Sequence, residues 1–279
     1  MRKILSETIV KSVEKALIDM NHTLDSSLIA RLKKAQAEEN LPLAKSIIDD
    51  LLNNEAIAKE GVFPLCQDTG MVVVFAEIGL EVMVEGDIEA AINKGAANAY
   101  QDGYLRKSIV NHPFKRENTK TNTPVIYHER RVKGSKLHLK IAAKGAGSEN
   151  MSRVYMLKPT VGEAGVIDAV VQTVVEAGGK ACPPIIVGVG IGGNLEKSAL
   201  LAKEALFRDL DDKNTDPSLA ALETLLYQKI NATGVGPMGV GGKTTCLAVK
   251  INTFPMHIAS LPVAINIQCH ASRHKEVVL

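Results

Sequence analysis

The spacing of the apolar residues changes at Gly61, and this change constrains the fold more than any other feature of the sequence. Before Gly61, apolar residues such as Ile9, Val13 and Leu17 recur at helical spacing. After it, runs rich in β-branched residues alternate with helix-like segments. The pattern predicts an α+β fold, with a helical N-terminal layer (1–61) and a mixed α/β body that contains a β-sheet (62–279).

The individual elements follow from the same periodicities. Helices are predicted within residues 6–60, with a turn at Asn21 and His22, and over 86–103, 162–179, 194–210 and 217–231. Strands are predicted over 71–80, 125–131, 136–145, 183–190, 246–255 and 262–269. Because no repeat or low-complexity linker divides the chain, we expect a single domain over residues 1–279.

Composition excludes several classes of protein. Lys and Arg total 33 and Asp and Glu total 31, so the formal charge of +2 does not fit a nucleic-acid-binding surface. The first twenty residues mix charges into every turn, unlike a signal peptide. No apolar run reaches the roughly 18 residues of a membrane-spanning helix. We therefore expect a soluble, cytoplasmic protein.

Two glycine-rich stretches imitate nucleotide-binding motifs. The stretch 188–193, GVGIGG, fits G-x-G-x-x-G but lacks the acidic residue expected at the end of the next strand. The stretch 234–245, GVGPMGVGGKTT, has Pro237 where a P-loop has its first glycine. Tight turns explain both stretches, although their backbone N–H groups also suit an anion. A nucleotide-binding module is thus a weaker alternative.

The four cysteines differ in their surroundings. Cys246 lies inside an apolar run, which is typical of a buried thiol. Cys66, Cys182 and Cys269 each lie at a predicted strand end, beside residues that break regular structure, as loop-borne ligands do. No C-x-x-C pair occurs, so any shared site must be assembled by the fold. Spacing alone leaves structural thiols and an iron–sulfur cluster with one open iron as alternatives.

Five motifs carry a resemblance to a known family. They are PLCQDTG (64–70), KGAGSEN (144–150), ACPPIIVGVGIGG (181–193), GVGPMGVGGKTT (234–245) and QCHASRH (268–274). In this order they resemble the α region of the class I fumarase and tartrate dehydratase family. The resemblance implies an oxygen-sensitive hydro-lyase with a 4Fe–4S cluster on Cys66, Cys182 and Cys269. It implies the reversible hydration of fumarate to L-malate, a reaction of the tricarboxylic acid cycle.

The resemblance also implies roles for further residues. Asp68 and His257 become catalytic candidates, although an Asx turn and a core position are their ordinary alternatives. Arg106 matches an arginine that reaches a substrate carboxylate, a pairing that the guanidinium group favours. The remaining substrate-binding candidates are Gln67, Gly145 and Gly147, with Lys144 and Asn150 as weaker ones.

A second polypeptide is implied as well. Single-chain members of the family carry a further β region, whereas this sequence ends soon after the third cysteine motif. The chain therefore resembles the α subunit of an α2β2 enzyme whose β subunit brings carboxylate-binding residues and the general base. KGAGSEN is closer to the fumarase form, and L-tartrate dehydration is the alternative. A non-catalytic iron–sulfur protein is the alternative from another class.

Overall fold

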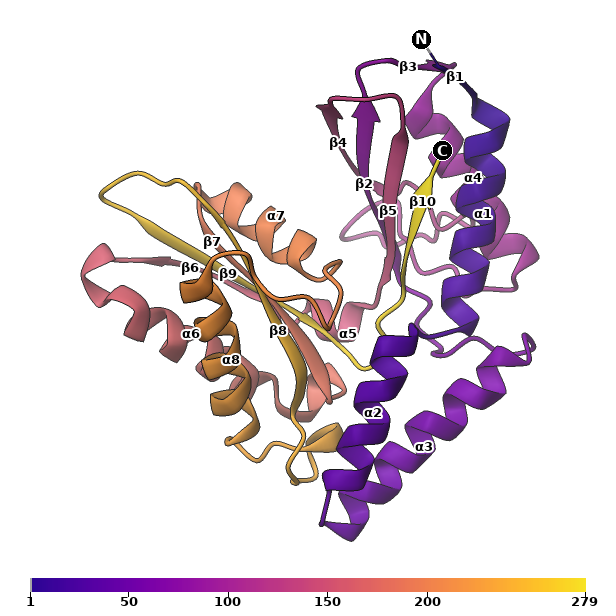
Figure 1. Ribbon diagram of the computed structural model, residues 1–279. Helices are drawn as coiled ribbons and strands as arrows, with labels where there is room; N and C mark the ends of the chain where they lie inside the picture. Colours follow the sequence, from indigo (N-terminus) through magenta and orange to yellow (C-terminus); the bar gives the residue numbers. More distant parts are fainter. Residues whose placement is uncertain (1) are drawn as a thin grey trace. The chain divides into compact units, whose positions relative to one another are not determined.

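The computed structural model describes residues 2–279 of the chain (Figure 1). Contacts within the chain group these residues into two compact units, each of which is described by itself. The first unit comprises residues up to Leu24, Glu55–Ala146 and Arg273–Leu279, and the second comprises Asp25–Asn54 and Gly147–Ser272. This grouping does not coincide with the division at residue 61, because the N-terminal helices are shared between the units.

The first unit is a mixed sheet covered by helices (Figure 1). Its helices are α1 (Ser6–His22), α4 (Ile88–Asp102) and the end of α3 (Pro42–Lys59). Its strands are β1 (Arg2–Leu5), β2 (Met71–Gly79), β3 (Val82–Glu85), β4 (Ile126–Val132), β5 (Leu137–Lys144) and β10 (His274–Val278). The main sheet has the order β10-β5-β2-β4, and β1 pairs separately with β3. Strand β2 is parallel to β4 and antiparallel to β5.

The helix–sheet core of this unit follows from the sequence pattern. Ile9, Val13 and Leu17 of α1 are completely buried, as the helical spacing predicts. Helix α1 packs along α4 and against β5 and β10. The Asp87 side chain accepts the N–H of Ala90 at 3.0 Å and begins α4 as an N-cap.

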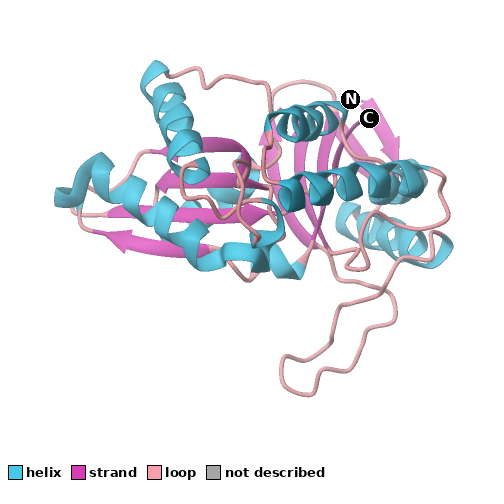
Figure 2. Ribbon diagram, turned by 90° about the horizontal axis from the view of Figure 1, so that it is seen from below, coloured by secondary structure: helices cyan, strands magenta, loops and turns pink. Residues whose placement is uncertain are grey.

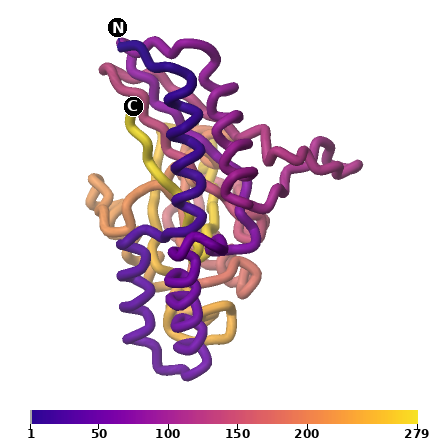
Figure 3. The backbone as a smooth tube through the Cα atoms, turned by 90° about the vertical axis from the view of Figure 1, so that its right-hand side faces the viewer, coloured from indigo at the N-terminus to yellow at the C-terminus, as the bar shows by residue number. Residues whose placement is uncertain are grey.

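A long loop between α4 and β4 projects from the first unit (Figures 2 and 3). The loop has internal order, since Val110 and Asn118 form a β-bridge. The buried Asn122 side chain accepts the N–H groups of Ser108 at 2.7 Å and Ile109 at 3.2 Å. At its far end, Phe114 is 88% exposed.

The second unit has its own four-stranded sheet, of order β6-β9-β7-β8. Its strands are β6 (Arg153–Leu157), β7 (Ile185–Gly192), β8 (Cys246–Phe254) and β9 (Leu261–Gln268). Its helices are α2 (Ser26–Glu38), most of α3, α5 (Ala146–Glu149), α6 (Gly162–Ala177), α7 (Leu195–Ala205) and α8 (Pro217–Asn231), with short 3₁₀ turns at Pro159–Val161, Gly178–Ala181 and Pro237–Gly239. Helix α7 packs on β7 and β9, whereas α6 and α8 lie side by side (Figure 1).

Glycines on β7 bring α7 unusually close to the sheet. A Cβ atom at Gly188 would lie 2.2 Å from the Ala202 carbonyl oxygen, and one at Gly190 would lie 2.0 Å from that of Ser198. Both glycines are inside the strand, paired with β8 and β9. The first two glycines of the G-x-G-x-x-G pattern therefore serve helix–sheet packing and lie outside the strand–helix turn that a dinucleotide site needs.

The predicted α+β fold is confirmed, including the helical N-terminal part and the mixed body. One local prediction is wrong: Asn21 and His22 belong to α1, which ends at His22. The Asn21 side chain donates to the Leu17 carbonyl at 2.8 Å. The His22 Nδ1 lies 2.9 Å from the Ile18 carbonyl oxygen, so both side chains support the last turn of the helix. The short strands β1, β3, β6 and β10 were not predicted. In the described part of the chain, no helix has the length and hydrophobicity to cross a membrane.

Candidate functional site

The turn of residues 62–70 is fixed to the first unit at both ends. The N–H of Leu65 donates to the Asn21 carbonyl at 2.7 Å, which ties the turn to the end of α1. The buried Thr69 hydroxyl donates to the Arg106 carbonyl at 2.8 Å. Between them, Cys66 is half-buried and Gln67 is exposed, with 3.4 Å between the Cys66 Sγ and the Gln67 Oε1. The turn therefore presents a thiol and an amide side by side.

Asp68 links this turn to the KGAGSEN motif. Its Oδ1 accepts the N–H of Gly70 at 3.0 Å, which closes an Asx turn, the ordinary role that the sequence left open. Its Oδ2 accepts the N–H of Ala146 at 2.8 Å. Gly70 has φ +81°, and a Cβ atom there would lie 2.7 Å from the Ala143 carbonyl carbon, so glycine is required. The carboxylate thus has a fixed orientation while remaining half-buried.

Two residues that sequence reasoning missed hold the same turn. The Tyr100 hydroxyl contacts the carbonyl oxygens of Thr69 at 2.5 Å and Gly70 at 2.8 Å. The Asn122 amide donates to the Gly70 carbonyl at 3.1 Å. Burial raises the pKa of Tyr100 well above its ordinary value, so this residue is a neutral hydrogen-bond donor. No local motif marks either residue, because both contacts join distant parts of the sequence.

The structure brings three further predicted residues to the turn. Arg106 is exposed at the base of the projecting loop, and its carbonyl is the one that Thr69 binds. Gly145 is buried, and a Cβ atom there would lie 3.3 Å from the Asp68 Oδ2. Lys144 is buried at the end of β5. Gly147 and Asn150 belong to the second unit, where both are exposed.

In the second unit, the Cys182 and Cys269 segments lie together. The His270 Nδ1 is 2.9 Å from the Cys182 carbonyl oxygen. Cys182 has a left-handed backbone, with φ +52°, and only Pro183 and Pro184 separate it from β7, whereas Cys269 directly follows β9. Both are half-buried. The 234–245 stretch joins them, since the N–H of Met238 donates to the Pro183 carbonyl at 2.8 Å.

His257 lies apart from these two cysteines within the second unit. It is exposed in the connection that precedes β9, whereas Cys269 follows the other end of that strand. Strand β9 has 8 residues and so spans ~26 Å at about 3.3 Å per residue. The His257 Nδ1 accepts the N–H of Ala259 at 3.1 Å, which places the proton of a neutral ring on Nε2.

The exposure and position of three of the four cysteines fit cluster ligands. Cys66, Cys182 and Cys269 are half-buried and lie in loops, as accessible ligands do, whereas Cys246 is completely buried. Burial raises the pKa of the Cys246 thiol to about 12, which opposes thiolate formation there. Among residues 2–279, neither unit by itself groups three His, Cys, Asp or Glu side chains as a metal site. Cys66 belongs to the first unit and the other two cysteines to the second, so the three-cysteine set stays a prediction.

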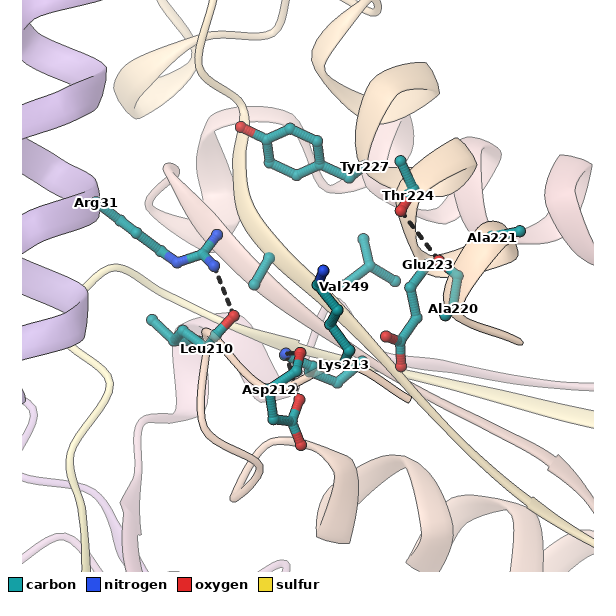
Figure 4. Close-up of a pocket in the computed structure, with 12 residues that line it drawn as sticks. Arg31, Leu210, Asp212, Lys213, Ala220, Ala221, Glu223, Thr224, Tyr227 and Val249 are labelled. Carbon is teal, nitrogen blue, oxygen red and sulfur yellow. Dashed lines mark hydrogen bonds and ion pairs between the residues drawn. The ribbon is translucent and has the colours of Figure 1, made fainter. Parts of the chain in front are cut away.

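A separate cavity of about 470 Å³ opens beside strand β8 in the second unit (Figure 4). It contains none of the residues predicted from the sequence. Three of its lining residues belong to an ion-pair network: the buried Lys250 Nζ lies 2.5 Å from the Asp212 Oδ1, and Glu223 Oε1 lies 2.7 Å from the Nη1 of Arg208, which is outside the lining. Glu223 also accepts the N–H of Ile251 at 2.7 Å. The network therefore covers the outer edge of β8 with mutually satisfied groups.

Comparison with known proteins places the chain in a family. A family model described as fumarate hydratase (fumerase) matches residues 10–278. The provisionally named L(+)-tartrate dehydratase subunit alpha of Methanocaldococcus jannaschii is 40% identical over 276 residues, which cover 96% of this chain and 95% of that protein. The L(+)-tartrate dehydratase subunit alpha of Escherichia coli (strain K12) is 27% identical over 254 residues, which cover 90% of this chain and 84% of that protein. The chain therefore belongs to the fumarate hydratase family of hydro-lyases.

Proposed function

We propose that the chain is the α subunit of a 4Fe–4S hydro-lyase that reversibly hydrates fumarate to L-malate. The observation that carries the proposal is the turn of residues 62–70, in which a half-buried thiol, an exposed amide and an anchored carboxylate follow one another. A turn whose cysteine was only structural would not require the Asp68 carboxylate to accept hydrogen bonds from the N–H groups of both Gly70 and Ala146. Family membership supplies the reaction class.

The dicarboxylate substrate sets the tasks of the side chains. Dehydration of malate removes a poorly acidic proton from C3 and a hydroxide from C2. Cys66, Cys182 and Cys269 would hold the cluster, which would supply Lewis-acid chemistry to the substrate oxygens. Arg106 binds a substrate carboxylate, and its exposed guanidinium leaves the donor edge accessible. Gln67 and the backbone donors around Gly145 and Gly147 stabilise negative charge that develops on a carboxylate.

Asp68 orients the substrate hydroxyl or holds the proton that moves during dehydration. A carboxylate has about four acceptor positions, and two of them are used by Gly70 and Ala146. The remaining capacity is available to a substrate O–H. The resemblance alone makes His257 the second catalytic candidate, because in this chain it lies at the opposite end of β9 from Cys269. We place the general base on the partner subunit.

A β subunit completes this proposal. Relatives of the chain are named as alpha subunits, which supports a partner polypeptide. We place the two chains in a cytoplasmic α2β2 enzyme. The same names favour a second candidate reaction, the dehydration of L-tartrate. The two substrates differ by one hydroxyl group, and the cysteines do not discriminate between them.

Kinetics of the assembled enzyme test the proposal. The chain is co-expressed with a β-type chain without oxygen, iron and sulfide are counted, and kcat/KM is measured for malate, fumarate and L-tartrate. We expect about four iron atoms per α chain, as a 4Fe–4S cluster requires, and a preference for malate and fumarate. A clear preference for L-tartrate would select the second reaction. Iron without turnover of any of the three substrates would indicate a non-catalytic iron–sulfur protein.

A further inference from the structure

Arg273 is a buried cation in the first unit that the proposed reaction does not yet use. Only 2% of the residue is exposed. It lies four residues after Cys269, directly before β10. A buried guanidinium group needs hydrogen-bond partners because its desolvation is costly. Its Nη1 donates to the Asn21 Oδ1 at 3.1 Å, whereas its Nε has no partner among residues 2–279.

The other edge of the guanidinium faces residues 144–146. A Cβ atom at Gly145 would lie 3.5 Å from the Arg273 Nη2 and 3.3 Å from the Asp68 Oδ2, so both charged groups border this glycine. The carbonyl of Arg273 also accepts the N–H of Ala143 at 3.0 Å. Arg273 therefore supports the residues that lead to Ala146, the N–H donor to Asp68.

Asn21 connects this support to the Asp68 turn from the opposite side. Its side-chain oxygen accepts from Arg273, and its carbonyl accepts the N–H of Leu65. Tyr100 interacts electrostatically with both Arg273 and Asp68. Burial has the largest effect on the pKa of Tyr100 and raises it; the positive charge of Arg273 lowers that pKa and the negative charge of Asp68 raises it. One buried cation thus borders Gly145 directly and is linked to the Asp68 turn through Asn21.

We propose that Arg273 is a positioning residue of the hydro-lyase site, whose buried guanidinium group holds residues 144–146 and the Asp68 turn in register. The inference rests on the proposed function for its catalytic consequence. The planar fork reaches Asn21 and the Gly145 segment at the same time, and a lysine ammonium in this place keeps the charge without that geometry. Arg273 acts on the substrate only through Asp68 and the backbone around Gly145.

Amide hydrogen exchange in the assembled enzyme measures this positioning directly. In the Arg273→Gln variant, the amides of Gly70 and Ala146 should exchange at least about tenfold faster, which corresponds to roughly 1.4 kcal/mol of lost protection. Arg273→Lys should show a smaller increase and a kcat lowered about tenfold with little change in KM, as expected when a positioned group loses its alignment. Amides of β7 should keep their wild-type rates.

Arg208→Lys is the matched control, because Arg208 is another largely buried arginine with side-chain and backbone partners, in the second unit. It should leave exchange at Gly70 and Ala146 unchanged. Should Arg273→Gln fail to fold, Asn21→Ala removes the side-chain acceptor of Arg273 and must raise exchange at the same two amides. Unchanged exchange there, or an equal increase in both units, would overturn the inference. Wild-type enzyme without hydro-lyase turnover would refute the proposed function alone, because the exchange measurement does not depend on substrate.

Discussion

Asp68 combines a turn-forming role with a candidate catalytic role. In the sequence these were alternatives, because an aspartate after a cysteine is often only the acceptor of an Asx turn. The structure places one carboxylate oxygen on Gly70 and the other on Ala146. These contacts fix the orientation of the group and leave acceptor positions on both oxygens. An anchored carboxylate is suited to precise work on a substrate.

Replacement of Asp68 by Asn should separate chemistry from cluster binding. The amide must turn its NH₂ toward one of the two backbone N–H donors, so one hydrogen bond is lost at a cost of about 1–3 kcal/mol in the free energy of unfolding. We expect full iron content and a kcat at least about 100-fold lower, the lower range for loss of an acid–base group. Iron analysis and steady-state kinetics on the same preparation check this. Wild-type turnover would remove Asp68 from the mechanism.

Serine replacements of the cysteines should divide them into two groups. Cys66→Ser, Cys182→Ser and Cys269→Ser should each lose most of the iron and the activity, because an alcohol is a far weaker ligand than a thiolate. Cys246→Ser is the matched control: Cys246 is completely buried at the start of β8 and should keep its iron, with a moderate loss of stability. Iron counts per chain decide the outcome, and equal iron in all four variants would contradict the assignment.

The residues that could be predicted from the sequence are those in distinctive local motifs. Cys66, Gln67 and Asp68 are contiguous, and the structure indeed places them in one turn. Tyr100, Asn122 and Arg273 could not be predicted. Their contacts with the turn or with Asn21 cross 30 to 252 residues of sequence, and no periodicity reports such pairs.

At the scale of elements, the glycine-rich stretch 234–245 depends on a carboxylate from another part of the second unit. Glu39, only 4% exposed, follows α2, and its Oε2 accepts the N–H of Lys243 at 2.7 Å. Its Oε1 accepts the N–H groups of Asn40 and Leu41, both at 2.9 Å. Burial acts to raise the pKa of Glu39, but these backbone hydrogen bonds outweigh it, and the pKa is lowered from 4.5.

A lowered pKa makes the contribution of Glu39 dependent on pH. The stability that it provides is present above the unfolded pKa and is lost as the pH falls through the lower, folded value. Glu39→Gln should therefore lower the free energy of unfolding by about 1–3 kcal/mol at pH 7. The gap between variant and wild type should close as the pH falls below about 4.5. Urea unfolding at several pH values measures the gap.

Glu38→Gln provides the control for that experiment. Glu38 is the preceding residue, but its side chain makes an exposed ion pair with Lys34 at 3.9 Å. Such pairs contribute little to stability, so this variant should follow the wild type at every pH. A constant gap for Glu39→Gln across the acid range would show that its ionisation is not coupled to folding.

The elements with strong periodicity were the predictable part of the fold. The long helices and the strands β2, β5, β7, β8 and β9 have many buried apolar residues, so their patterns are clear. Strands β1, β3 and β10 are only 4 or 5 residues long, so RKIL, VMVE and HKEVV are too short to show an alternation. Their positions depend on pairing with distant strands, which a local pattern does not contain.

At the scale of the whole molecule, the candidate ligands come from parts of the chain that no local pattern connects. Cys182 and Cys269 approach each other because they lie next to β7 and β9, which are neighbours in the second sheet. That pairing is a tertiary feature, and the sequence predicted it only through the resemblance of five separated motifs. Cys66 belongs to the other unit, and no local pattern connects it with these two cysteines.

The proposed activity depends on the partner polypeptide. The proposed substrate has two carboxylates, and the candidates in this chain suffice to hold one of them, so the second carboxylate and the general base fall to the β subunit. We expect the purified chain alone to show less than about 1% of the turnover of the assembled enzyme, a deficit of about 2.7 kcal/mol in transition-state stabilisation. Titration of the chain with the β-type chain, without oxygen, should restore fumarate hydration, and the rate should stop rising when the two chains are present in equal amounts. Exposure of the assembled enzyme to air should then abolish activity, since an iron open to substrate is also open to oxidants. Strong fumarate hydration by the chain alone would refute the two-subunit proposal, because this chain would then have to supply both carboxylate sites and the base.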